Sequence, residues 1–117
     1  MSKLKIADLF AGVGGLSQGF ISKGFEVEVA IEYDKDIAKS YQLNHPKTKV
    51  YDEDISTINL NELKNNHQNI DVIVGGPPCQ GFSQKGKRKI MDDPRNYLFK
   101  YFFEVVSVVR PKYFVLE

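Results

Sequence analysis

Apolar and polar positions alternate along this chain in blocks that predict strands and helices in turn. Short apolar runs bounded by polar or glycine residues are typical of buried strands, and apolar residues three and four positions apart are typical of amphipathic helices. We predict strands at 4–10, 26–31, 49–51, 70–74 and 113–116. We predict helices at 16–23, from 34 to before 46, at 58–65 and at 97–109. This order favours an open, doubly wound and mainly parallel α/β sheet with helices on both faces.

Three residues mark the ends of the predicted helices. Gly24 follows the first helix and is typical of a helix C-terminus. Asp34 precedes the second helix, where its carboxylate can cap free backbone amides. Pro111 ends the last helix. A chain of 117 residues is the size of one domain, and we find no repeat and no linker in it.

Composition narrows the class of protein only modestly. The formal net charge is +1, so any binding of nucleic acid has to come from a local basic patch or from another part of the protein. No apolar run reaches the length of a membrane span, and the N-terminus has no signal-peptide core. The single cysteine excludes an internal disulfide and favours a reducing compartment. We therefore expect a cytoplasmic protein with no membrane partner and no metal site.

The single cysteine, Cys79, lies in an unusual loop. The apolar run Asp71–Val74 is followed by Gly-Gly-Pro-Pro-Cys-Gln-Gly-Phe-Ser at 75–83. A strand that ends this way presents the thiol at the carboxyl edge of the sheet, where open α/β sheets bind ligands. The two prolines stiffen the approach to the cysteine. A free cysteine is more often a small buried hydrophobe, but this setting favours a nucleophile.

A second group of residues indicates a nucleotide-type site. The glycine turn at 8–15 joins the first strand to the first helix, where the backbone can approach a ligand closely. Glu32 ends the next strand about 20 residues later, the spacing at which an acid binds ribose hydroxyls. Asp54 and Tyr33 could complete an adenosine pocket, although Asp54 could equally cap a helix and Tyr33 cover the sheet edge. No Gly-Lys-Ser/Thr phosphate-binding loop is present.

The order of these motifs closely resembles the N-terminal half of the catalytic domain of DNA (cytosine-5)-methyltransferases. The turn at 8–15 looks like the first motif of that family, Glu32-Tyr33 the second and Asp54-Ile55 the third. The stretch 76–83 resembles the Pro-Cys motif, and 93–99 resembles the motif that follows it. Residues 114–117 look like the start of the Glu-Asn-Val motif. The resemblance covers nearly the whole chain, in the order typical of the family.

The resemblance implies a Rossmann-like fold and S-adenosylmethionine as cofactor. The glycine turn would approach the methionine part, Glu32 the ribose, and Asp54 with Ile55 the adenine, with Tyr33 against its face. The full implied set of cofactor contacts is Phe10, Ala11, Gly12, Gly14, Gly15, Glu32, Tyr33, Asp54, Ile55, Pro77 and Leu98.

The resemblance also implies a catalytic set and a DNA-contacting loop. Cys79 would add to carbon 6 of a flipped-out cytosine, with Pro78 beside it and Glu117 on the ring nitrogen and amino group. The following loop would close over the base, with its cations on the phosphates. The implied DNA contacts are Gln80, Ser83, Lys85, Lys87, Arg88 and Arg95.

The family pattern continues beyond what this chain contains. Its Asn-Val after the glutamate, its Gln-x-Arg-x-Arg segment and its target-recognition domain have no counterpart here. We therefore expect residues 1–117 to be a partial catalytic domain, inactive alone and dependent on a complementary C-terminal half or second subunit, in a bacterial enzyme that acts on double-stranded DNA of the nucleoid. The alternatives are the tRNA-methylating branch of the family, which Gly81 disfavours, and a non-catalytic cofactor-binding subunit or remnant.

Overall fold

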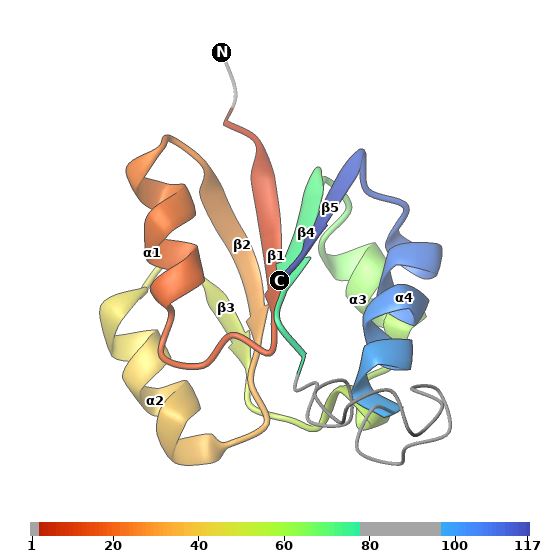
Figure 1. Ribbon diagram of the computed structural model, residues 1–117, viewed down its shortest axis with the longest axis horizontal. Coiled ribbons are helices and arrows are strands. Elements are labelled where there is room, and N and C mark those ends of the chain that lie inside the picture. Colours follow the sequence, from red (N-terminus) through yellow and green to blue (C-terminus); the bar gives the residue numbers. More distant parts are fainter. Residues whose placement is uncertain (1–2, 78–96) are drawn as a thin grey trace, which may run out of the picture.

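A parallel five-stranded sheet forms the middle layer of the molecule (Figure 1). The computed structural model describes residues 3–77 and 97–117. The strand order is β3-β2-β1-β4-β5, and each neighbouring pair is parallel. The strands are β1 (Lys5–Leu9), β2 (Glu26–Ile31), β3 (Lys49–Tyr51), β4 (Val72–Gly75) and β5 (Tyr113–Leu116).

Helices cover both faces of the sheet, as predicted. In Figure 1, α1 and α2 lie on one side, and α3 and α4 lie on the other. The helices are α1 (Gly15–Ser22), α2 (Lys35–Asn44), α3 (Leu60–Asn66) and α4 (Tyr97–Val109), with a short 3₁₀ helix, η1 (Ile55–Thr57), before α3. Among the described residues, no helix has the length and apolarity needed to span a membrane.

The alternation of side chains along β1 shows why both faces are covered. Ile6 packs in a cluster with Leu16 and Phe20 of α1. Leu9 packs in a different cluster with Phe102 of α4. Successive strand residues point to opposite faces, so an apolar strand of this kind buries its surface only between two layers of helices. The predicted fold class is confirmed.

The positions of the helices create a topological switch point between β1 and β4. The chain leaves β1 toward α1 on one face, and it packs α4, which follows β4 in the chain, on the other face. The segments that follow β1 and β4 therefore diverge, and the crevice between them is where open α/β sheets bind ligands. Gly75 allows the close approach of the two strands, because a Cβ there would lie 2.6 Å from the carbonyl oxygen of Leu9.

The predicted helix at 58–65 corresponds to α3, which begins two residues later and ends one residue later. The short helix η1 before it was not predicted, and each of the two helices has its own cap. The Asp54 side chain accepts from the Ser56 amide, and the Asn59 side chain accepts from the Glu62 amide. Asn59 therefore caps α3, and the helix begins at Leu60 rather than at Ile58. Other boundaries differ by one or two residues, and those of β2, β3, α4 and β5 are as predicted.

The end of α1 is a Schellman motif. Gly24 has φ of +93° and donates its amide to Ile21, while the Phe25 amide donates to Phe20. The rings of Phe20 and Phe25 meet edge to face at 5.2 Å. This arrangement satisfies carbonyls at the helix end and adds the apolar contact typical of the motif. The capping residue itself is Lys23, with Gly24 one position beyond it.

We expect Gly24→Ala and Gly19→Ala to change stability in opposite directions. A Cβ at either position meets no atom within 4 Å, so the two differ in backbone conformation alone. Gly24→Ala should lower the free energy of unfolding by about 1 kcal/mol, because an L-residue is strained at positive φ. Gly19→Ala, inside α1, should raise it by up to about 1 kcal/mol. Urea unfolding of both variants measures this, and equal effects would contradict the assignment.

Candidate functional site

The glycine turn after β1 is held in a tight left-handed path. Phe10 has φ of +58°, Gly12 of +60° and Gly14 of +100°. The Ala11 amide donates to Ile31 at the end of β2, and the Gly14 amide donates back to Ala11. Phe10 occupies a conformation that bulky residues rarely adopt, and such strain is concentrated at ligand sites. The turn leads into the N-terminus of α1 at the switch point.

The Glu32 carboxylate fastens this turn to the next strand. One oxygen accepts from the Gly12 amide at 2.8 Å, and the other accepts from the Asp34 amide at 2.7 Å. The Glu32 amide itself donates to Tyr51 of β3. An ionised carboxylate has about four acceptor sites, so each oxygen of Glu32 keeps capacity for a further donor. The predicted ribose-binding acid is therefore oriented before any ligand arrives.

A pocket of about 500 Å³ opens at this edge of the sheet. Six of the predicted cofactor contacts line it, together with three residues that the sequence did not single out. The predicted ones are Phe10, Glu32, Tyr33, Asp54, Ile55 and Leu98. The additional ones are Ile31, Glu53 and Gly76. The volume lies within the range of small-molecule sites.

The pocket has an apolar wall and an acidic rim. Phe10, Ile31, Ile55 and Leu98 supply apolar surface from four different elements or their ends. Asp54 lines the pocket and also caps η1. One carboxylate oxygen accepts from the Ser56 amide and from the Ser56 hydroxyl, the latter at 2.8 Å. The alternative interpretation of Asp54 as a helix cap is thus correct without excluding its place in the pocket.

The remaining predicted cofactor contacts lie around this pocket rather than on its wall. Ala11, Gly12, Gly14 and Gly15 form the turn and the start of α1. Pro77 is buried, two residues after β4 ends.

The catalytic set falls only partly within the described residues. Glu117 follows β5, and its amide donates to Gly75 at 2.9 Å. A Cβ on Gly76 would lie 3.3 Å from the Glu117 carboxylate, so this side chain lies close to the end of β4. Outside the described residues lie Pro78, Cys79, Gln80, Ser83, Lys85, Lys87, Arg88 and Arg95.

Sequence reasoning missed a buried polar cluster behind the glycine turn. The Ser17 hydroxyl donates to Asp8 and lies 2.6 Å from the hydroxyl of Tyr41. Burial raises the pKa of Asp8 to about 7, and the nearby carboxylates of Glu117 and Glu32 contribute to the rise. Burial also raises the pKa of Tyr41 to about 12. The available signal was a carboxylate inside an apolar strand, Ile6-Ala7-Asp8-Leu9.

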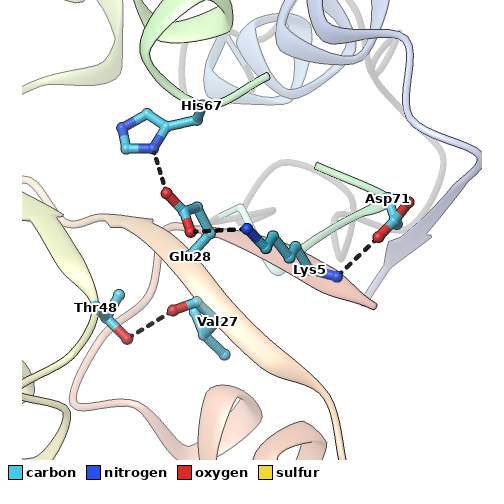
Figure 2. A network of polar contacts seen from close by, with 6 residues as sticks. All are labelled: Lys5, Val27, Glu28, Thr48, His67 and Asp71. Atoms are coloured by element: carbon cyan, nitrogen blue, oxygen red, sulfur yellow. Dashed lines mark hydrogen bonds and ion pairs between the residues drawn. The ribbon is translucent and has the colours of Figure 1, made fainter. Parts of the chain in front are cut away.

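A separate polar network supports the start of the sheet (Figure 2). The pairing of β1 with β2 skips Glu28, which lies 3.9 Å from the Lys5 ammonium and 3.0 Å from Nδ1 of His67. His67 Nε2 lies 2.9 Å from the Tyr51 hydroxyl, and the Lys5 amide donates to Asp71. None of these residues lines the pocket, so the network is structural. In residues 3–77 and 97–117, no cluster of three or more metal-ligating side chains is present.

This arrangement is the Rossmann-like architecture of S-adenosylmethionine-dependent methyltransferases, with a pocket at the switch point. The chain belongs to the C-5 cytosine-specific DNA methylase family, whose profile matches residues 4–117. The family predicted from the order of the motifs is confirmed.

Curated relatives are longer than this chain. It is 44% identical to the type II methyltransferase M1.HphI of Haemophilus parahaemolyticus, and the match covers 97% of the chain and 32% of that protein. It is also 44% identical to M.AquIA of Picosynechococcus, covering 97% of the chain and 47% of that protein. The chain therefore spans about a third to a half of the length of these relatives.

Solved structures show the same fold. An E. coli protein described as a prophage-encoded DNA modification methyltransferase superposes with a TM-score of 0.81 at 40% identity, over 97% of this chain and 31% of that one. A variant of DNMT2 from Spodoptera frugiperda superposes with a TM-score of 0.66 at 28% identity, over 89% of this chain and 31% of that one.

We expect Asp8→Asn to change the pH dependence of stability. The folded pKa of Asp8, about 7, lies above its ordinary value of 3.8. Its contribution to stability is therefore complete below pH 3.8 and is lost as the pH rises through about 7. Asparagine resembles the protonated carboxyl and cannot ionise. The stability of Asp8→Asn relative to the unchanged protein should rise between pH 5 and 7, by at most about 1.4 kcal/mol per pH unit.

Denaturant unfolding at pH 5, 6, 7 and 8 measures this difference. A difference that stays constant over the whole range would contradict the raised pKa.

Proposed function

We propose that this chain is the cofactor-binding and nucleophile-bearing part of an enzyme that methylates carbon 5 of cytosine in DNA. The observation that carries the proposal is the pocket at the switch point, where the Glu32 carboxylate is held by the Gly12 and Asp34 amides. Membership of the C-5 cytosine-specific DNA methylase family supports the substrate class.

The residues of the pocket fit S-adenosylmethionine. Its ribose offers two hydroxyl donors, which suit the remaining acceptor sites of Glu32. Its adenine is flat and largely apolar, and Phe10, Ile55 and Leu98 provide an apolar wall. Its sulfonium is a cation, and the acidic rim supplies the opposite charge. We propose that Asp54 and Ile55 hold the adenine edge, with Tyr33 against its face.

Cys79 is the proposed nucleophile. Carbon 5 of cytosine is too electron-poor to take a methyl group directly. Addition of the Cys79 thiolate to carbon 6 forms a C–S bond and moves electron density to carbon 5. When bound, S-adenosylmethionine would supply an electrophilic methyl group to carbon 5, with its methyl–sulfur bond broken and S-adenosylhomocysteine left behind. Loss of the carbon 5 proton then breaks the C–S bond and releases Cys79.

Glu117 is the proposed stabiliser of the cytosine ring during this addition. Its position beside Gly76, at the end of β4, is consistent with a shared site with the Pro78-Cys79 loop. A hydrogen bond that a protonated Glu117 donates to the ring nitrogen, together with one that it accepts from the amino group, would stabilise the charge that builds on the ring.

The proposed DNA substrate requires functions beyond this chain. A cytosine inside a duplex is not accessible, so the base has to be flipped out. We propose that the basic residues Lys85, Lys87, Arg88 and Arg95 contact the phosphates, with Gln80 and Ser83 near the base. The greater length of the relatives supports a complementary C-terminal part that recognises the target sequence.

A cofactor-binding protein without catalysis is the alternative. It would share the pocket, but the intact Pro78-Cys79 pair together with Glu117 favours the enzyme.

We expect Glu32→Gln to weaken binding of S-adenosylmethionine by about 10- to 100-fold, the cost of losing hydrogen bonds to a charged acceptor. In this variant the side-chain NH2 group of glutamine would also face one of the backbone N–H groups from which the carboxylate now accepts a hydrogen bond. Glu53→Gln is the matched control, because Glu53 lines the same pocket and would lose only a rim charge. Calorimetric titration compares the two variants. If the two variants bound S-adenosylmethionine with equal affinity, Glu32 would not be the residue that binds the ribose.

We expect Cys79→Ser to abolish methyl transfer while leaving cofactor affinity unchanged. The assay uses the protein together with the C-terminal part that its relatives carry, on cytosine-containing duplex DNA. Unmodified protein should form a covalent adduct with a 5-fluorocytosine duplex, because fluorine at carbon 5 blocks release of the cysteine. Cys79→Ser should form none. A variant that methylates at the normal rate would show that Cys79 is not the nucleophile.

A further inference from the structure

The buried carboxyl of Asp8 belongs to neither the pocket wall nor the proposed catalytic set. Asp8 is 1% exposed and precedes Leu9, the last residue of β1. The Ser17 hydroxyl, on α1 and fully buried, donates to it at 2.5 Å. The Tyr41 hydroxyl, on α2, lies 2.6 Å from Ser17. A chain of hydrogen bonds therefore joins the end of β1 to both helices on this face.

A third buried hydroxyl, that of Thr48, lies close enough to lower the pKa of Tyr41. The Thr48 hydroxyl donates to the carbonyl of Val27 at 2.9 Å (Figure 2). The residues Ser17, Tyr41 and Thr48 are all buried, so their hydroxyls are shielded from solvent.

This chain can satisfy its hydrogen bonds with Asp8 in either charge state. A hydroxyl can donate one hydrogen bond and accept others. When Asp8 is ionised, Tyr41 donates to Ser17 and Ser17 donates to the carboxylate. When Asp8 is protonated, Asp8 can donate to Ser17, and Ser17 can donate to Tyr41. The two hydrogen bonds of this chain therefore persist when Asp8 gains or loses a proton.

The groups that act on Asp8 are acidic or neutral. Burial is the main cause of its raised pKa, and Glu117 after β5 and Glu32 after β2 raise it further. Helix α1 carries no titratable side chain, and α2 presents Tyr41. Among the described residues, no lysine or arginine contributes to this shift. Within residues 3–77 and 97–117, the groups that shift the pKa of Asp8 therefore bring no positive charge, which a cationic ligand would supply.

The same cluster supports the glycine turn. A Cβ on Gly14 would lie 2.5 Å from Nε2 of His45 and 3.0 Å from the ring of Tyr41. The rings of Tyr41 and His45 are 4.4 Å apart. Tyr41 therefore contacts the turn on one side and takes part in the hydrogen-bond chain on the other.

We propose that Asp8 is a charge-compensating positioning residue, which holds a proton in the cofactor-free site and releases it to solvent when a sulfonium ligand binds at the adjoining edge. This inference rests on the proposed cofactor site. Asp8 does not line the pocket. Its charge would therefore act on the ligand electrostatically, across the glycine turn, and not by direct contact.

Calorimetric titration in two buffers of different ionisation enthalpy tests the inference. With S-adenosylmethionine at pH 7, we expect the protein to release about half a proton per site, because Asp8 is then half protonated. S-adenosylhomocysteine has the same amino and carboxyl groups but lacks the sulfonium charge, so it should release clearly less. This comparison uses the unmodified protein and does not depend on a variant folding.

Two variants assign the proton to Asp8. Asp8→Asn should lose the difference between the two ligands. Ser17→Ala keeps the carboxyl but removes its donor, so the difference should move to higher pH. Equal proton release with both ligands, or a difference that persists in Asp8→Asn, would overturn the inference and leave the proposed function standing. Failure of S-adenosylmethionine to bind the unmodified protein would overturn both.

Discussion

The geometry of the candidate site depends on one carboxylate that is held by two backbone amides. Glu32 accepts from Gly12 in the turn after β1 and from Asp34 at the start of α2. These bonds connect the ends of β1 and β2, two neighbouring parallel strands, at the carboxyl edge of the sheet. They also fix the orientation of the acid, so that its remaining acceptor sites are prepared before a ligand binds. The left-handed path of Phe10 and Gly12 is held in place by the same contact.

The electrostatics of this edge follow from the fold. Parallel strands bring their carboxyl ends together, so Glu32 and Glu117 act on Asp8 although they are far from it in the sequence. Burial raises the pKa of Asp8 to about 7, so Asp8 is about half protonated at neutral pH, which limits its repulsion with the other two carboxylates. The edge is therefore suited to a positively charged ligand, and the hydrogen-bond chain behind Asp8 allows its charge to change.

Much of the fold and site followed from the sequence. The strand–helix alternation, the acid about 20 residues after the glycine turn, and the pocket positions of Phe10, Glu32, Asp54 and Leu98 were all predicted. Features that depend on distant contacts were not. Ser17 has no local signal that links it to Asp8 or Tyr41, because those contacts exist only after α1 and α2 pack on the same face.

A crystal structure of the protein with S-adenosylmethionine tests the central claim most directly. We expect the ribose hydroxyls within hydrogen-bond distance of Glu32, the adenine against Phe10 and Ile55, and the amides of Gly12 and Asp34 still bonded to Glu32. Cofactor density elsewhere, such as along the apolar groove of α4 beside Phe103, would contradict the account. So would a complex in which Glu32 releases the turn.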